Sequence, residues 1–357
     1  MKQRNHAFDL LCGICIVRMM MLHIMSFCQM QGEDWWVEVM HWSYFFMSFF
    51  FFKAGYFNKT LHGDTASFLL KKTRQLIVPY VVWGVMGAIV YLGFAWLVLP
   101  SNNTMVRSIS WEHLWSTSSF YGNGPVWFLM SFFTAYVAMH LISRADEWCD
   151  RRHLPLRLSW IVLLFPFVSY QLCQMGNPLW LNFNNVFWGI FLFLLGRLWH
   201  ECLDQQPRRQ MLWLSVAMIA VFVVLNLWDR GEYTMSSNLW TGLYPATLTK
   251  TLCALCGFSG LFLLIGVPRV PVLGYIGEHS MVFFVAHYPL LTFYQMLRSS
   301  FVRTLRGHWD DMIILCLLTF VFCFWIVPYV ERVPWLSGRF PTSAQKTADN
   351  AAETQKT

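Results

Sequence analysis

Long apolar stretches separated by short polar segments follow one another along almost the whole chain. A helix that crosses a bilayer needs about 20 mainly apolar residues, and ten stretches approach this length. The pattern predicts an all-α protein, a polytopic membrane helix bundle of about ten transmembrane helices. We expect these helices near residues 7–28, 40–57, 76–98, 125–143, 158–174, 185–199, 211–228, 246–267, 275–297 and 312–330.

The composition indicates that the lipid bilayer is the solvent of this chain. Hydrophobic residues make up 56% and charged residues only 13%, whereas about a quarter of a soluble domain is charged. Aromatic residues reach 18%, as expected where they pack between helices and form interfacial belts. We therefore expect one membrane domain over residues 1–341, followed by a polar tail over 342–357 that is predicted to be disordered.

Basic residues determine the predicted orientation. The net charge is +7, but Lys and Arg lie in short clusters between apolar runs, which argues against binding to nucleic acid. Cytoplasmic loops hold an excess of Lys and Arg. With the N-terminus inside, eighteen of the 26 basic residues are cytoplasmic and six are outside, and only the segment Arg298–Arg306 resists the rule. This split predicts a multi-pass protein of the cell membrane with both termini in the cytoplasm.

Three ionisable residues stand in the first predicted span. An ionisable group inside a membrane is costly, so each is a candidate for function. At 100° per residue, Asp9 shares a helix face with His23 and is a candidate catalytic residue that orients His23 through intervening groups. Arg18 lies about 140° away and is expected to find its partner on another helix. His23 is either a hydrogen-bonded packing residue or a general base, because imidazole titrates near neutral pH.

Basic residues also flank the second and third spans. Lys53 stands near the inner end of the second span, where it either extends to the interface or serves the site. Lys71, Lys72 and Arg74 precede the third span on the cytoplasmic side. They are either a plain membrane anchor or a clamp for phosphate groups, which Lys and Arg bind well.

Trp127 and His287 are the candidates in the later spans. Trp127 begins the fourth span on the outer side, where Trp is also common as a belt residue. His287 lies about 18 Å along a helix that starts inside, and His23 lies about 22 Å from the inner end of its span. We therefore expect His23, Trp127 and His287 to approach one another in the outer half of the membrane.

Metal binding is not expected. Two Cys-x-x-Cys pairs occur, Cys12 with Cys15 and Cys253 with Cys256, and two such pairs together are able to hold zinc. Both lie in apolar helices without His or acidic support, so we interpret them as packing residues. The sequence also lacks a Gly-rich phosphate loop, a Gly-x-Ser-x-Gly elbow and a His-Glu-x-x-His motif.

In their order along the chain, these features resemble the acyltransferase 3 family of membrane O-acyltransferases. Leu11-Cys12-Gly13 stands where the family usually has Leu-Arg-Gly, and His23 falls on the family's first-span His. The other matching positions are Ala54-Gly55-Tyr56 for the family's Ser-Gly-Tyr, Lys71, Arg74 and Pro79 for its basic pair before Pro, the unchanged Trp127-Phe128-Leu129, and Gly277, Ser280, His287 and Pro289 for its Gly-x-x-Ser and His-x-Pro.

The resemblance implies an O-acyltransferase, of the O-acetyl type, with acetyl-CoA as acyl donor and a hydroxyl of a cell-surface or lipid-linked glycan as acceptor. It implies that His23 is the general base and that the basic residue normally found at position 12 belongs to the active site. Cys12 replaces that residue here, so Arg18 or Lys53 is expected to supply the missing charge.

The same resemblance implies that Lys71, Lys72 and Arg74 hold the coenzyme A phosphates, whereas Trp127, His287 and Lys53 lie near the substrate. Two alternatives are a polytopic transporter or flippase for a glycan or small metabolite, and the other large class of membrane acyltransferases, which also places a His in an apolar helix. A transporter is expected to show paired halves with interrupted helices, and none is visible in the sequence. The oligomeric state stays open.

Overall fold

The computed structural model describes residues 5–57, 64–98, 111–154, 157–301 and 309–340. This part of the chain is 83% helical, which confirms the predicted all-α membrane bundle. One antiparallel hairpin interrupts the helices, in which β1 (Tyr233–Thr234) pairs with β2 (Leu239–Trp240). The tail predicted over 342–357 lies outside the described residues.

Within the described residues, seven helices are long and apolar enough to cross a membrane. Three further helical segments occupy the remaining predicted spans, so the expected number of about ten was an approximation. The seven are α1 (His6–Phe27), α4 (Thr65–Lys72) continuing through η1 (Thr73–Ile77) into α5 (Val78–Val98), η2 (Gly124–Val126) with α8 (Trp127–Arg151), η4 (Trp180–Asn185) with α10 (Val186–Gln205), α11 (Arg208–Trp228), α12 (Tyr244–Ile265) and α15 (Trp309–Arg332). The other three are α3 (Phe46–Phe57), η3 (Leu158–Leu164) with α9 (Phe165–Gln174), and α14 (Ser280–Phe301), and short helices complete the bundle at α2 (Asp34–Trp42), α7 (Trp111–Thr117), η5 (Met235–Ser237), α13 (Pro271–Glu278) and α16 (Pro334–Ser337).

The helix predicted over 40–57 is broken in the structure. A turn over residues 43–45 separates α2 from α3. The Ser43 hydroxyl donates to the Val39 carbonyl, and such a bond competes with continued helix formation. The apolar pattern did not reveal this break, although the break turns residues of the α2–α3 connection toward α1.

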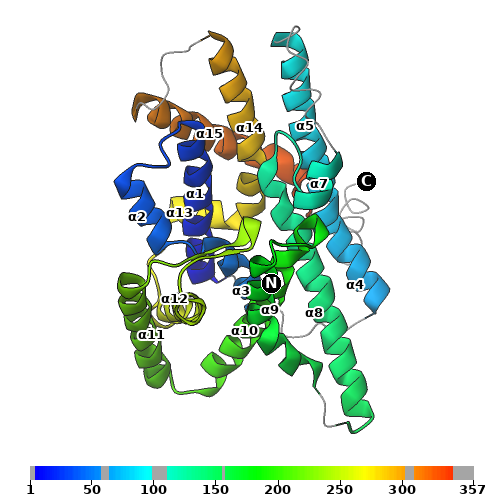
Figure 1. Ribbon diagram of the computed structural model, residues 1–357, viewed down its shortest axis with the longest axis vertical. Coiled ribbons are helices and arrows are strands. Elements are labelled where there is room, and N and C mark those ends of the chain that lie inside the picture. The colour runs from blue at the N-terminus through cyan, green and yellow to red at the C-terminus, as the bar shows by residue number, and fades with distance from the viewer. Residues whose placement is uncertain (1–4, 58–63, 99–110, 155–156, 302–308, 341–357) are drawn as a thin grey trace, which may run out of the picture.

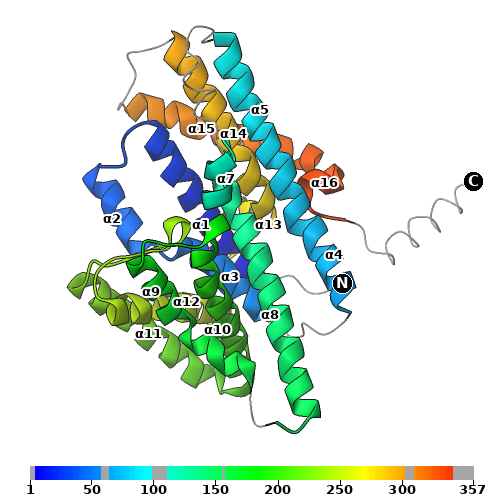
Figure 2. The ribbon, with the colours of Figure 1, turned by 45° about the vertical axis from the view of Figure 1, so that its right-hand side comes forward.

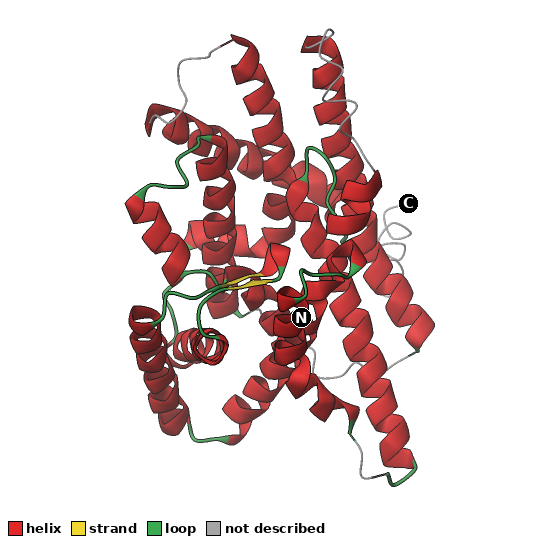
Figure 3. Cartoon of the chain, viewed as in Figure 1, coloured by secondary structure: helices red, strands yellow, loops and turns green. Residues whose placement is uncertain are grey.

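Helix α1 lies among several others and packs against α13, α14 and α3. In Figure 1 it stands between α2 and α14, with α11 and α12 below it, while α5, α4 and α8 form the opposite flank. Figure 2 shows α5 and α14 side by side along that flank, and Figure 3 shows how little of the bundle is not helical.

Two glycines, one on each helix, allow α1 and α13 to cross in contact. A Cβ at Gly13 would lie 2.1 Å from the Leu273 carbonyl oxygen, and one at Gly277 would lie 1.8 Å from the Asp9 carbonyl oxygen. Helices in membranes commonly approach through such small residues. The crossing fixes α13 against the first half of α1, so α14, which follows α13, runs beside the second half.

Candidate active site

Two histidines from distant parts of the sequence meet between α1 and α14. The ring centroids of His23 and His287 lie 5.3 Å apart with the rings stacked at 30°. The ring of Tyr288 meets His23 edge-on at 5.0 Å. His23 and His287 therefore lie close together, as their positions along their helices predict.

His287 is completely buried and His23 is half-buried. The Nδ1 atom of His287 donates a hydrogen bond to the Phe283 carbonyl oxygen at 2.9 Å, because a carbonyl oxygen can only accept. Its Nε2 atom has no hydrogen-bond partner among the described residues. His287 is thus enclosed behind His23, and His23 is the imidazole that a substrate can reach.

A cavity of about 270 Å³ opens against His23. Arg18 and Trp127, two other residues predicted for the site, line the same cavity. Trp127 begins α8 and is 9% exposed. The structure therefore brings a histidine, a cation and an aromatic ring from α1 and α8 to one cavity.

Arg18 is held in place by the connection between α2 and α3. Its Nε donates to the Ser43 hydroxyl at 3.0 Å, and its guanidinium carbon lies 3.8 Å from the centroid of the Phe46 ring. A cation over an aromatic face is attracted by the ring quadrupole. The partners of Arg18 are on other segments, as expected, but its long side chain still reaches the cavity of His23.

The hairpin forms another wall of the cavity, with Glu232, Tyr233, Thr234, Met235 and Ser236 among the lining residues. Amide side chains of the η4 segment hold it from below, since Asn185 donates to the Met235 carbonyl at 3.0 Å and Asn182 donates to the Ser236 carbonyl at 2.9 Å. Such bonds fix the hairpin on rigid elements. Sequence reasoning missed these lining residues because they lie in a polar loop outside the apolar spans.

Two basic residues secure the segment that leads into the hairpin. Lys250 is fully buried in α12 and donates to the Asp229 carbonyl at 2.6 Å. Arg230 pairs with Glu38 of α2, and this hydrogen bond and the positive charge hold the pKa of the Glu38 carboxyl below its usual value. These two contacts hold the segment before Glu232 against α12 and α2.

Asp9 and Lys53 are not brought to this cavity. Asp9 lines a separate cavity with Pro271 and Tyr275, about 21 Å along α1 from His23 at 1.5 Å per residue. The Nζ atom of Lys53 donates to the Cys12 sulfur at 3.0 Å. Lys53 therefore places its charge beside position 12, about 16 Å along the helix from His23.

The three basic residues before α5 point in different directions. Lys72 lies with its amine 3.4 Å from the centroid of the Tyr136 ring on α8. Arg74 is exposed and lies 5.9 Å from the Phe340 ring, and Lys71 is also exposed. Lys71 and Arg74 remain accessible to a ligand, whereas Lys72 is engaged by the protein.

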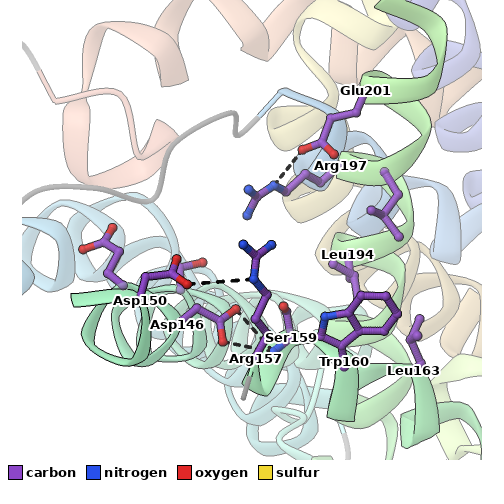
Figure 4. Close-up of a pocket in the computed structure, with 12 residues that line it drawn as sticks. Asp146, Asp150, Arg157, Ser159, Trp160, Leu163, Leu194, Arg197 and Glu201 are labelled. Atoms are coloured by element: carbon purple, nitrogen blue, oxygen red, sulfur yellow. Dashed lines mark hydrogen bonds and ion pairs between the residues drawn. The ribbon is translucent and has the colours of Figure 1, made fainter. Parts of the chain in front are cut away.

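A second cavity of about 290 Å³ lies between α8, η3 and α10 (Figure 4). The side chains of Arg157 and Arg197 point toward one another in this cavity. Arg157 pairs with Asp150 at 3.9 Å, and Arg197 pairs with Glu201 at 3.1 Å. No histidine lines this cavity. Its ion pairs are partly exposed and contribute little individually.

The fold and the cavity define a polytopic membrane protein with a histidine site inside the bundle. The sequence model of a family described as an acyltransferase domain matches residues 5–328, nearly the whole chain. The chain belongs to this family, the acyltransferase 3 family, and is a membrane acyltransferase. Neither a curated protein nor a solved structure matches it significantly.

Proposed function

We propose that the protein is an O-acetyltransferase that moves an acetyl group from acetyl-CoA to a hydroxyl of a cell-surface or lipid-linked glycan. The observation that carries the proposal is the cavity in which His23 is accessible, with His287 stacked behind it. Arg18 and Trp127 line the same space. A base can take the hydroxyl proton, a cation can offset developing negative charge, and an aromatic wall suits the apolar face of a sugar ring.

In this proposal His23 is the general base. A hydroxyl is a weak nucleophile at neutral pH, and a histidine within reach can accept its proton. The hydroxyl oxygen then bonds to the thioester carbonyl carbon, the carbon–sulfur bond breaks, and the departing coenzyme A thiolate takes up the proton. Negative charge develops on the carbonyl oxygen during this step, and Arg18 is the cation in the cavity that offsets it.

The donor is proposed to approach from the cytoplasmic end of the bundle. Lys71 and Arg74 are exposed there and suit the phosphates of coenzyme A. Lys53 beside Cys12 places a further cation between that end and His23. With both termini in the cytoplasm, the cavity falls in the outer half of the membrane, where an acceptor outside the cell membrane is accessible.

Radiolabelled acetyl-CoA added to the purified protein tests the proposal. The enzyme is expected to release coenzyme A and label a glycan acceptor supplied with membranes, whereas a transporter or flippase would leave the thioester intact. Mass spectrometry of glycans from cells with and without the gene is expected to reveal the acceptor as the glycan that loses an acetyl mass. An intact thioester with all membrane fractions would refute the enzymatic reading.

A further inference from the structure

Two formally charged residues are found among the described residues that line the His23 cavity, and they have opposite signs. Arg18 reaches the cavity from α1 and Glu232 reaches it from the hairpin segment. Arg18 is only 8% exposed, and its Nη1 atom has no hydrogen-bond partner in the described part of the chain. Their charges attract each other, yet the two side chains form no hydrogen bond between them.

Opposite charges on two walls restrict what the cavity accepts. A carboxylate or phosphate attracted to Arg18 would be repelled by Glu232. An ammonium group attracted to Glu232 would be repelled by Arg18. Like-charge contacts of this kind are a common means of excluding the wrong ligand. A hydroxyl both donates and accepts hydrogen bonds, so a ring with several hydroxyls satisfies the guanidinium and the carboxylate together.

The remaining walls fit the apolar faces of such a ring. Trp127, Phe284 and Tyr44 line the cavity, and pockets for small molecules typically combine aromatic walls with a few placed polar groups. The volume of about 270 Å³ lies near the lower limit of roughly 300 Å³ for such pockets. The space is suited to one sugar ring, with the rest of a glycan outside.

We propose that Glu232, which lines the same cavity as Arg18, selects an uncharged sugar ring as the acceptor and excludes sugars that carry a carboxylate. This inference rests on the proposed acetyltransferase function and defines its acceptor. Glu232 is the residue to test, because Arg18 also has a proposed part in the transfer step.

The experiment compares methyl hexopyranosides with the matching methyl hexuronides, using the purified protein, its Glu232→Gln variant and the control Glu112→Gln. Glu112 is an exposed glutamate of α7 that is absent from the lining of the His23 cavity. Two readouts are taken for each sugar at high millimolar concentration. One is acetyl transfer from labelled acetyl-CoA, and the other is the melting temperature, which a ligand of the native state raises.

The wild-type protein and Glu112→Gln are expected to favour the neutral sugar in both readouts. Because Glu232→Gln removes a like-charge contact with the hexuronide carboxylate, this variant is expected to raise the hexuronide-to-hexoside ratio by about tenfold or more. An unchanged ratio, a wild-type preference for hexuronides, or no effect of any sugar on transfer or melting would overturn the inference. In each of these cases the proposed acetyltransferase function still stands if the protein labels acceptors in native membranes, so the two failures are distinguishable.

Discussion

The amine of Lys53 on α3 lies 3.0 Å from the sulfur of Cys12 on α1. Cys12 is completely buried and Lys53 is half-buried. The resemblance of Leu11-Cys12-Gly13 to the family's Leu-Arg-Gly implies a basic residue at position 12, and α3 supplies a cation at that place. Arg18, the other candidate, reaches the His23 cavity instead. We infer that Lys53 substitutes for the missing basic residue and that Arg18 serves the cavity.

Relocating this charge provides a test. Lys53→Met removes the cation while keeping most of the volume, and we expect acetyl transfer to fall by about tenfold or more, which corresponds to about 1.4 kcal/mol. Adding Cys12→Arg to that variant returns a cation to the same place and is expected to recover activity. Cys12→Ala alone is expected to be mild, because a neutral thiol cannot do the work of an Arg. A double variant no more active than Lys53→Met would contradict the substitution.

Replacing His23 tests the proposed general base. His23→Ala is expected to lower the rate of transfer by about 10²–10⁴, the contribution typical of a positioned base, while leaving the folded protein in the membrane. His6→Ala is the matched control, since His6 is exposed at the start of the same helix. Transfer is measured with labelled acetyl-CoA, and insertion by expression and monodispersity. Normal transfer by a well-folded His23→Ala protein would leave His23 a packing residue.

The sequence predicted the meeting of His23 and His287 because the rise of a helix is constant. Each histidine has a fixed distance from the end of its apolar span, so a shared depth follows once the span ends are known. The same arithmetic separates Asp9 from His23 by about 21 Å, and the structure indeed places Asp9 in another cavity. A shared helix face was not sufficient to make Asp9 a partner.

Features that depend on tertiary contact were not predictable in this way. Nothing in the apolar run 40–57 marks the turn at Ser43. The hydroxyl of Ser43 accepts the hydrogen bond from the Nε atom of Arg18. Glu232 lies in a polar loop of ordinary composition, and tertiary contacts, among them the packing of the hairpin on η4, bring it to the cavity. Lys53 and Cys12 are 41 residues apart, and the crossing of α1 and α3 alone determines their contact.

Two glycines of α13 give a direct test of the crossing that positions α14. A methyl group at Gly277 would collide with the Asp9 carbonyl oxygen, whereas one at Gly274 would meet nothing within 4 Å. Gly277→Ala is therefore expected to destabilise the protein by about 1–3 kcal/mol, as overpacking does, and to reduce transfer by moving His287. Gly274→Ala is expected to be neutral or slightly stabilising, because Ala favours helix more than Gly. Equal melting temperatures for the two variants would argue against the close crossing.

Arg74 tests the proposed binding of the donor. Arg74 is exposed, and its guanidinium is suited to pair with a phosphate of coenzyme A in both the ground state and the transition state. Loss of such uniform binding raises the Michaelis constant without changing the turnover number. Arg74→Ala is therefore expected to raise the apparent KM for acetyl-CoA severalfold while kcat stays nearly constant.

Arg144→Ala is the control, because Arg144 is also exposed but pairs with Glu147 within α8 at 3.3 Å. If Arg74→Ala and Arg144→Ala show the same KM as the wild type, Arg74 is a membrane anchor and the coenzyme A phosphates bind elsewhere.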